Sequence, residues 1–171
     1  MFSINESFIF GDITIIVSVT DKKCFYGNKD GNIIFLYLPV SHSANINNPT
    51  AQKALKLLLS KILIKEGKNL LPQLTVEWAQ KMNLSFNELK IKRVKSRWGS
   101  CSSQNNINLS CYLMMLPKHL IDYVVVHELC HVKHKNHGPQ FKTLLHSYFP
   151  NWRVYEEEMK IAARKIYWLM F

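Results

Sequence analysis

The sequence predicts an α+β protein in which a small, mostly antiparallel sheet packs against several helices. Two observations lead to this class. The first 40 residues contain runs rich in β-branched residues, whereas from residue 51 onwards many apolar residues recur at spacings of three and four. A chain of 171 residues, 47% of them hydrophobic, is long enough to bury one core. We therefore expect a single domain over 1–171, with an N-terminal β-rich part over 1–45 and a helical part over 46–171.

The N-terminal part is predicted to begin with strands over residues 13–19 and 33–38. Both runs are rich in β-branched and aliphatic residues, and the Asp30-Gly31 pair between them favours a hairpin turn. The polar segment 41–50 then connects the strands to the helices within the same domain.

The rest of the chain is predicted to consist of helices with two further strands among them. A helix over residues 51–65 is expected to end at Gly67, since glycine commonly terminates helices. The other predicted elements are a helix over 72–82, strands over 89–98 and 107–113 joined by a polar turn at 102–106, and helices over 116–135, 139–149 and 153–169. Proline is favoured at the first position of a helix, so Gly138-Pro139 marks the start of one of them.

The composition narrows the classes of protein. Lysine and arginine number 22 against 12 acidic residues, a net charge of +10 that suits nucleic acid, a membrane surface, an acidic substrate or a solvated lysine-rich surface. No apolar run approaches the roughly 18–20 residues of a membrane helix, and residues 1–6 lack the basic segment of a signal peptide. The four cysteines show no C-x-x-C spacing. We therefore expect a cytoplasmic protein without membrane insertion, and the pattern gives no prediction of oligomeric state.

A His-Glu-x-x-His motif at residues 127–131 lies in the most apolar of the predicted helices. His127 and His131 are separated by about 6 Å along the helix axis and face the same side, so both imidazoles can bind one zinc ion. Glu128 then lies beside the ion, where its carboxylate can take a proton from a zinc-bound water molecule. The motif predicts a zinc-dependent hydrolase with Glu128 as the catalytic base.

A catalytic zinc ion needs a third protein ligand, and His134 and His137 are the nearby candidates. His134 follows His127 by seven residues, about 10.5 Å along a straight helix, whereas nitrogens that share one zinc ion lie about 3.3 Å apart. His137 can reach the ion if the helix stops near Lys135 and the chain turns at Asn136, which tolerates a left-handed conformation. We favour His137, because Gly138-Pro139 forces a new start of the chain after this turn. Three histidines that hold one ion leave a fourth position for water, as a catalytic site requires.

Several stretches of the sequence together carry a family resemblance. They are Ser96-Arg97-Trp98-Gly99-Ser100-Cys101, Pro117, the segment Ile121 to His131, and Asn136-His137-Gly138-Pro139-Gln140-Phe141. These residues resemble the YgjP-like metallopeptidase family and are more distantly similar to SprT-like zinc proteases. The resemblance implies a zincin-like fold, zinc-dependent hydrolysis of peptide bonds, a peptide or protein substrate, and His137 as the third zinc ligand. Cys130, at a position where the family often has a small residue, is a mild departure.

Residues 90–98 form a basic segment on a predicted strand. The resemblance implies that a strand beside the metal-binding helix pairs with an extended substrate. Two alternatives are a lysine-protected sheet edge and contact with nucleic-acid phosphates. The last alternative would make the protein a DNA-associated, SprT-like protease or a nucleic-acid-binding module. A metal-binding pseudoenzyme without peptide cleavage is a further alternative.

Four further side chains are candidates for substrate binding or oxyanion stabilisation at the site. Arg97 and Trp98 are candidates for substrate binding, and Arg97 can also stabilise the oxyanion that forms during hydrolysis. Pairing of Arg97 with Asp122 is the structural alternative. Tyr148 and His146 are other candidate oxyanion donors. His146 could also bind the metal from the following helix, but a surface or core position is the favoured interpretation of this residue.

Overall fold

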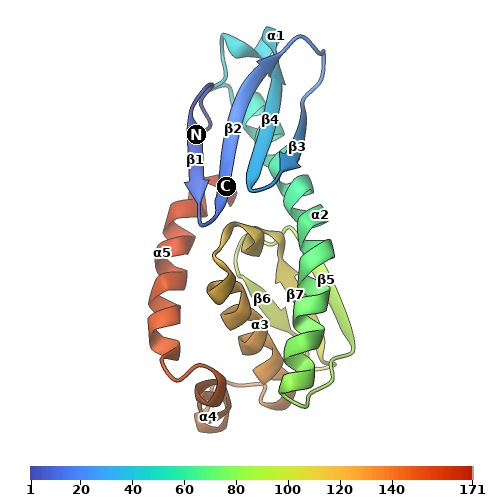
Figure 1. Cartoon of the computed structure of the whole chain (residues 1–171), viewed down its shortest axis with the longest axis vertical. Helices are drawn as coiled ribbons and strands as arrows, with labels where there is room; N and C mark the ends of the chain where they lie inside the picture. The colour runs from blue at the N-terminus through green and yellow to red at the C-terminus, as the bar shows by residue number, and fades with distance from the viewer. Residues whose placement is uncertain (171) are drawn as a thin grey trace. The chain divides into compact units, whose positions relative to one another are not determined.

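The computed structural model describes residues 1–170, which divide into two compact units. Unit 1 comprises Met1–Leu63 and the C-terminal segment that starts at Lys165, and unit 2 comprises Ile64–Arg164. In chain order the elements are β1 (Ser7–Phe10), β2 (Ile13–Thr20), β3 (Tyr26–Asp30), β4 (Ile33–Pro39), α1 (Val40–Ser43), α2 (Pro49–Lys81), β5 (Glu88–Lys92), β6 (Gly99–Cys101), β7 (Asn106–Ser110), the 3₁₀ helix η1 (Cys111–Met115), α3 (Lys118–Lys133), α4 (Pro139–Tyr148) and α5 (Trp152–Met170) (Figure 1). The predicted α+β class is confirmed, whereas the division of the chain into domains stays a prediction.

The sheet of unit 1 has the strand order β1-β2-β4-β3. The predicted strands over 13–19 and 33–38 are present as β2 and β4, but the hairpin between them is wrong, because these two strands pair in parallel. The turn at Gly31, whose φ of 51° suits glycine, instead joins β4 to the antiparallel strand β3. Strand β3 was missed because its residues, Tyr-Gly-Asn-Lys-Asp, carry almost no β-branched or aliphatic side chains.

The two helices predicted on either side of Gly67 and Pro72 are one continuous helix, α2. Gly67 does not end it: a Cβ there would lie 3.0 Å from Cγ2 of Ile91, so the glycine lets β5 pack closely against the helix. Pro72 removes one backbone donor, at a cost of about 3 kcal/mol inside a helix. Burial of apolar side chains such as Leu71 in the same turns offsets this cost.

The sheet of unit 2 has the strand order β5-β7-β6, with β6 antiparallel and β5 parallel to β7. The turn predicted at 102–106 is confirmed, and its first arm is β6. The predicted strand over 89–98 is interrupted, because β5 stops at Lys92 and no regular element covers residues 93–98. The predicted strand over 107–113 ends at Ser110, whose hydroxyl accepts a hydrogen bond from the Tyr112 amide and caps the 3₁₀ helix. The expected single sheet is therefore two small sheets.

The three C-terminal helices lie close to their predicted positions. Helix α3 contacts β6, β7 and α4, and most of its side chains are buried in the core of unit 2. Helix α4 begins at Pro139 directly after Gly138, as predicted. Because α3 carries residues 127–131, the packing of this helix on the sheet positions the motif.

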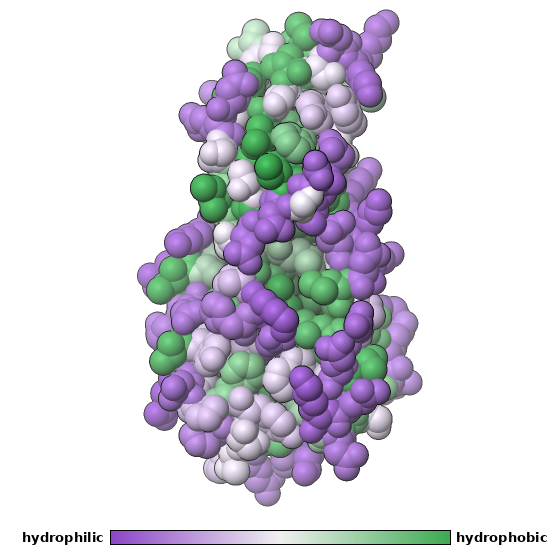
Figure 2. Space-filling view, in the orientation of Figure 1, coloured by the Kyte–Doolittle hydropathy of each residue, from purple (hydrophilic) through white to green (hydrophobic). Residues whose placement is uncertain are grey.

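On the face shown in Figure 2, hydrophilic side chains are interspersed with apolar ones. None of the helices within residues 1–170 is long and apolar enough to cross a membrane. The four cysteines, all within the described chain, are free thiols, and Cys111 and Cys130 are buried.

Candidate metal centre

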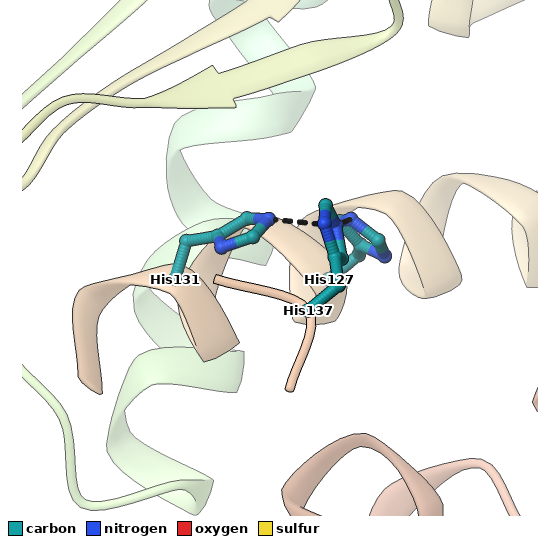
Figure 3. Close-up of side chains that lie close together, drawn as sticks. All are labelled: His127, His131 and His137. Carbon is teal, nitrogen blue, oxygen red and sulfur yellow. Dashed lines mark hydrogen bonds between the residues drawn. The ribbon is translucent and has the colours of Figure 1, made fainter. Parts of the chain in front are cut away.

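Three histidines of unit 2 point their side chains at one another (Figure 3). His127 and His131 come from one face of α3, and His137 comes from the loop that follows it. The Nε2 atom of His137 lies 3.0 Å from Nε2 of His127 and 3.1 Å from Nε2 of His131. These separations are close to the roughly 3.3 Å expected for nitrogens that share one tetrahedral zinc ion.

The loop after α3 makes this convergence possible. The helix ends at Lys133, and the His134 amide closes its last turn by donating to the carbonyl of Cys130 at 2.9 Å. The His134 carbonyl lies 3.1 Å from Nδ1 of His131, so Nδ1 donates a hydrogen bond to it. The structure therefore brings His137, and not the side chain of His134, to the other two histidines. The expected left-handed turn at Asn136 is wrong, because the described residues with positive φ lie elsewhere in the chain.

The chemistry of the three nitrogens fits a divalent cation. Because Nδ1 of His131 carries its proton, Nε2 of the neutral ring offers a lone pair. Nε2 of His137 either carries a proton or has a lone pair, so it cannot donate to His131 and accept from His127 at the same time. One of its two close contacts would therefore have no hydrogen bond. A cation that accepts a lone pair from each ring would satisfy all three. Burial, and then the proximity of the other two histidines, lowers the pKa of His127 to about 3, which keeps this ring neutral.

Glu128 lies next to the histidines and is almost completely enclosed, with 6% of its surface exposed. Its Oε2 atom is buried and has no hydrogen-bond partner. Burial raises the pKa of this carboxyl to about 7, although the guanidinium of Arg97 opposes the shift. Gly99 of β6 closes over the carboxyl group: a Cβ at Gly99 would lie 2.6 Å from Oε1 and Cγ of Glu128. The glycine is therefore required for β6 to pass this close to Glu128.

The other candidate residues are divided between this site and distant positions. Arg97 and Trp98 line a cavity that also contains His127 and Glu128. The proposed pairing of Arg97 with Asp122 is wrong, because Asp122 accepts hydrogen bonds from Nε1 of Trp78 at 3.0 Å and from Lys118 at 2.6 Å.

Tyr148 and His146 are not brought into this cavity. The ring of Tyr148 packs edge-on against Trp78, and His146 lines a separate pocket at the end of α4. The basic segment 90–98 does not form one strand, and Lys90 within it pairs with Glu88 at 2.7 Å.

Two features of the site were not predicted from the sequence. Lys135 donates hydrogen bonds to the Ser102 carbonyl at 2.9 Å and to the Asn105 side chain, which ties the loop after α3 to the β6–β7 turn. Tyr123 precedes His127 by one helical turn and lines the same cavity. The i to i+4 spacing of Tyr123 and His127 could have indicated the shared face, but not the cavity.

The fold and the site together define an α+β protein with a histidine cluster suited to a divalent metal ion. A family model described as "YgjP-like, metallopeptidase domain" matches residues 14–162 of the chain. The chain therefore belongs to the YgjP-like metallopeptidase family, and the resemblance inferred from the sequence is confirmed. Membership identifies it as a metal-dependent peptidase whose substrates are peptides or proteins.

Individual relatives cover about half of the chain. The uncharacterized protein MJ0123 of Methanocaldococcus jannaschii is 33% identical over 92 residues, which make up 50% of this chain and 84% of the relative. The metallopeptidase zymogen jannalysin of Methanocaldococcus jannaschii aligns at 28% identity over 54% of this chain and 94% of its own, with a TM-score of 0.47. The metallopeptidase zymogen abylysin of Pyrococcus abyssi aligns at 19% identity over 52% of this chain and 90% of its own, with a TM-score of 0.48.

Proposed function

We propose that the protein is a zinc peptidase that holds one zinc ion with His127, His131 and His137 and uses Glu128 as its catalytic base. The observation that carries this proposal is the convergence of the three Nε2 atoms beside a buried carboxyl oxygen without a partner. Three histidine ligands are typical of catalytic zinc sites, which keep a coordination position for water or substrate.

The residues of this chain have separate roles in the proposed reaction. A bound zinc ion supplies a Lewis acid that polarises the peptide carbonyl and acidifies water. The carboxylate of Glu128 accepts the proton of the attacking water and returns it to the nitrogen of the departing amine. The hydrogen bond from Nδ1 of His131 to the His134 carbonyl holds that ring in the orientation and tautomer that present Nε2.

Strand β6 is the part of the sheet that we expect to bind the substrate backbone. It pairs with β7 on one side and forms an edge of the sheet, and its Gly99 lies against Glu128. An extended peptide that paired with this edge would gain backbone hydrogen bonds with little dependence on sequence. This assigns to β6 the role that the sequence suggested for the basic segment 90–98.

Metal removal tests the proposed function. We expect one zinc ion per chain by inductively coupled plasma mass spectrometry, and cleavage of an internally quenched peptide library that stops after chelation and returns when zinc is added. Chelation should also lower Tm, because an ion at 100 times its Kd stabilises the folded state by about 2.7 kcal/mol. Cleavage that survived complete removal of the metal would contradict the proposal.

Gly99→Ala is expected to reduce cleavage by about 10²-fold, because displacement of a catalytic group by about 1 Å has an effect of this size. The added methyl group would overlap the Glu128 carboxyl group and push it from its position. The measurement is kcat/KM on the same peptide library, with zinc content as a second readout that should not change. Gly138→Ala is the matched control, since a Cβ at Gly138 meets nothing within 4 Å. Equal activity of the two variants would refute the role of the close contact.

A further inference from the structure

The loop that carries His137 connects α3 to α4 and spans residues 134–138 (Figure 3). Backbone hydrogen bonds fix its two ends. The His134 amide donates to the Cys130 carbonyl at 2.9 Å, and the Gly138 carbonyl accepts a hydrogen bond from the first turn of α4 at 3.1 Å. His137 lies between these ends and is exposed to solvent. The position of the third histidine therefore depends on what holds the middle of the loop.

Lys135 ties the middle of this loop to the turn between β6 and β7. Its ammonium group donates hydrogen bonds to the Ser102 carbonyl at 2.9 Å and to Oδ1 of Asn105. The same group lies 3.9 Å from Sγ of Cys101, the last residue of β6. Hydrogen bonds from a charged donor are stronger than those between neutral groups. The contact therefore joins the residue two positions before His137 to a separate part of unit 2.

The turn is a firm point of attachment, because its own backbone is hydrogen-bonded. The Asn105 amide donates to the Ser102 carbonyl at 3.0 Å, and the Ser102 amide donates to the Asn106 carbonyl at 2.9 Å. The Asn105 carbonyl accepts a further hydrogen bond from the Asn87 amide at 3.0 Å. Asn105 has a φ of 60°, in the left-handed region that asparagine tolerates better than most residues. Both oxygen atoms that accept from the lysine thus belong to a well-fixed turn.

We propose that Lys135 is a positioning residue that holds His137 where it can bind the metal ion, through its hydrogen bonds to the β6–β7 turn. This inference rests on the proposed function, because it concerns the third ligand of the same zinc site. A ligand that is already held near its bound position loses less conformational freedom on binding, so the affinity is higher. The exposed loop of His137 gains the most from such an attachment.

The charge of Lys135 by itself predicts the opposite effect on the metal. A positive charge near the site repels a divalent cation, so removal of that charge would strengthen zinc binding. Removal of an attachment that holds the loop would weaken it. The sign of the change in zinc affinity therefore separates positioning from electrostatics.

Zinc affinity of the full chain is measured by competition with a chelator of known affinity. Lys135→Met keeps most of the apolar stem of the side chain and removes the ammonium group. We expect it to weaken zinc binding about tenfold, the lower end of the effect of groups that orient metal ligands. Lys133→Met is the matched control, because Lys133 is exposed and follows His131 by two residues, whereas the donor to the turn is Lys135. Its zinc Kd should be unchanged or slightly lower.

A double-mutant cycle tests the direct contact. Asn105→Gly removes one of the two oxygen acceptors, and glycine keeps the left-handed conformation of the turn. We expect this variant to weaken zinc binding by less than Lys135→Met does. The double variant Lys135→Met/Asn105→Gly should bind zinc as Lys135→Met does, because the two residues act through one contact.

NMR relaxation of the zinc-free protein tests the attachment without the metal. The backbone order parameters of residues 135–138 should be about 0.85 in the wild-type protein and in Lys133→Met, and should fall below about 0.6 in Lys135→Met. The Tm of the zinc-free protein should not change, because a hydrogen bond at an exposed lysine contributes little to global stability. At saturating zinc, kcat and KM of Lys135→Met should equal those of the wild type, since the residue acts through the ligand.

The outcomes separate this proposal from the proposed function. Tighter zinc binding by Lys135→Met, an equal loss in Lys133→Met, additive losses in the double variant, or unchanged order parameters would each overturn the role of Lys135. A lower Tm of the zinc-free variant would show a general structural role and would also overturn it. If the wild-type protein binds zinc but cleaves no peptide, the peptidase proposal fails while the zinc affinities still decide this one. If it binds no zinc, the proposed function fails, and the order parameters decide whether Lys135 holds the loop of His137.

Discussion

Glu128→Gln is expected to keep its metal and to lose peptide cleavage by about 10²–10⁴-fold in kcat, the contribution of a positioned general base. Glutamine has the shape of glutamate, so it fits under Gly99, where a larger group would not. Its amide nitrogen cannot accept the proton of a water molecule. The histidine cluster is left intact, so zinc content should equal that of the wild-type protein.

The matched control for this variant is Glu88→Gln, which changes an exposed glutamate paired with Lys90 at the opposite edge of the same sheet. Activity and zinc content should both be unchanged there. Cleavage by Glu128→Gln at the wild-type rate would show that another group serves as the base. Loss of zinc together with activity would show that the carboxyl group binds or supports the metal.

His137→Ala should lose zinc, whereas His134→Ala should retain it. The first substitution removes one of three converging Nε2 atoms. Mutation of a residue that only hydrogen-bonds to a metal ligand lowers metal affinity by about 10–100-fold, so we expect the loss of a ligand itself to lower zinc affinity by at least about 10²-fold. His134 contributes its backbone carbonyl to His131, and alanine keeps that carbonyl. The measurement is the zinc content of each variant after equilibration in a zinc buffer of fixed free concentration.

The two variants control for each other, because both change a histidine in the short loop between α3 and α4. His137 is exposed, so its replacement should have little effect on the packing of the core. The Tm values of the two zinc-free variants should therefore agree with that of the zinc-free wild type. Full zinc retention in His137→Ala combined with loss in His134→Ala would reverse the choice of third ligand.

The fold was predictable where local patterns decide structure. Helices α3, α4 and α5 lie within about two residues of their expected ends, because apolar periodicity and the prolines at 117 and 139 act over a few neighbouring residues. The break expected between residues 65 and 72 was wrong because α2 packs against β5 through Gly67, a contact with a distant segment. Strand β3 was missed because pairing with β4, and not its own composition, makes it a strand.

The sequence by itself determined which residues belong to the family motif and which of them share a face of the helix. The reason is that residues four positions apart lie on the same face of an α-helix. The sequence also favoured His137 as the third histidine, but only tertiary structure decided that its Nε2 lies within 3.1 Å of the other two and that Gly99 closes over Glu128. The physical reason is that these contacts join segments whose approach depends on the packing of α3, β6 and α5 around one core. No spacing along the chain encodes those distances.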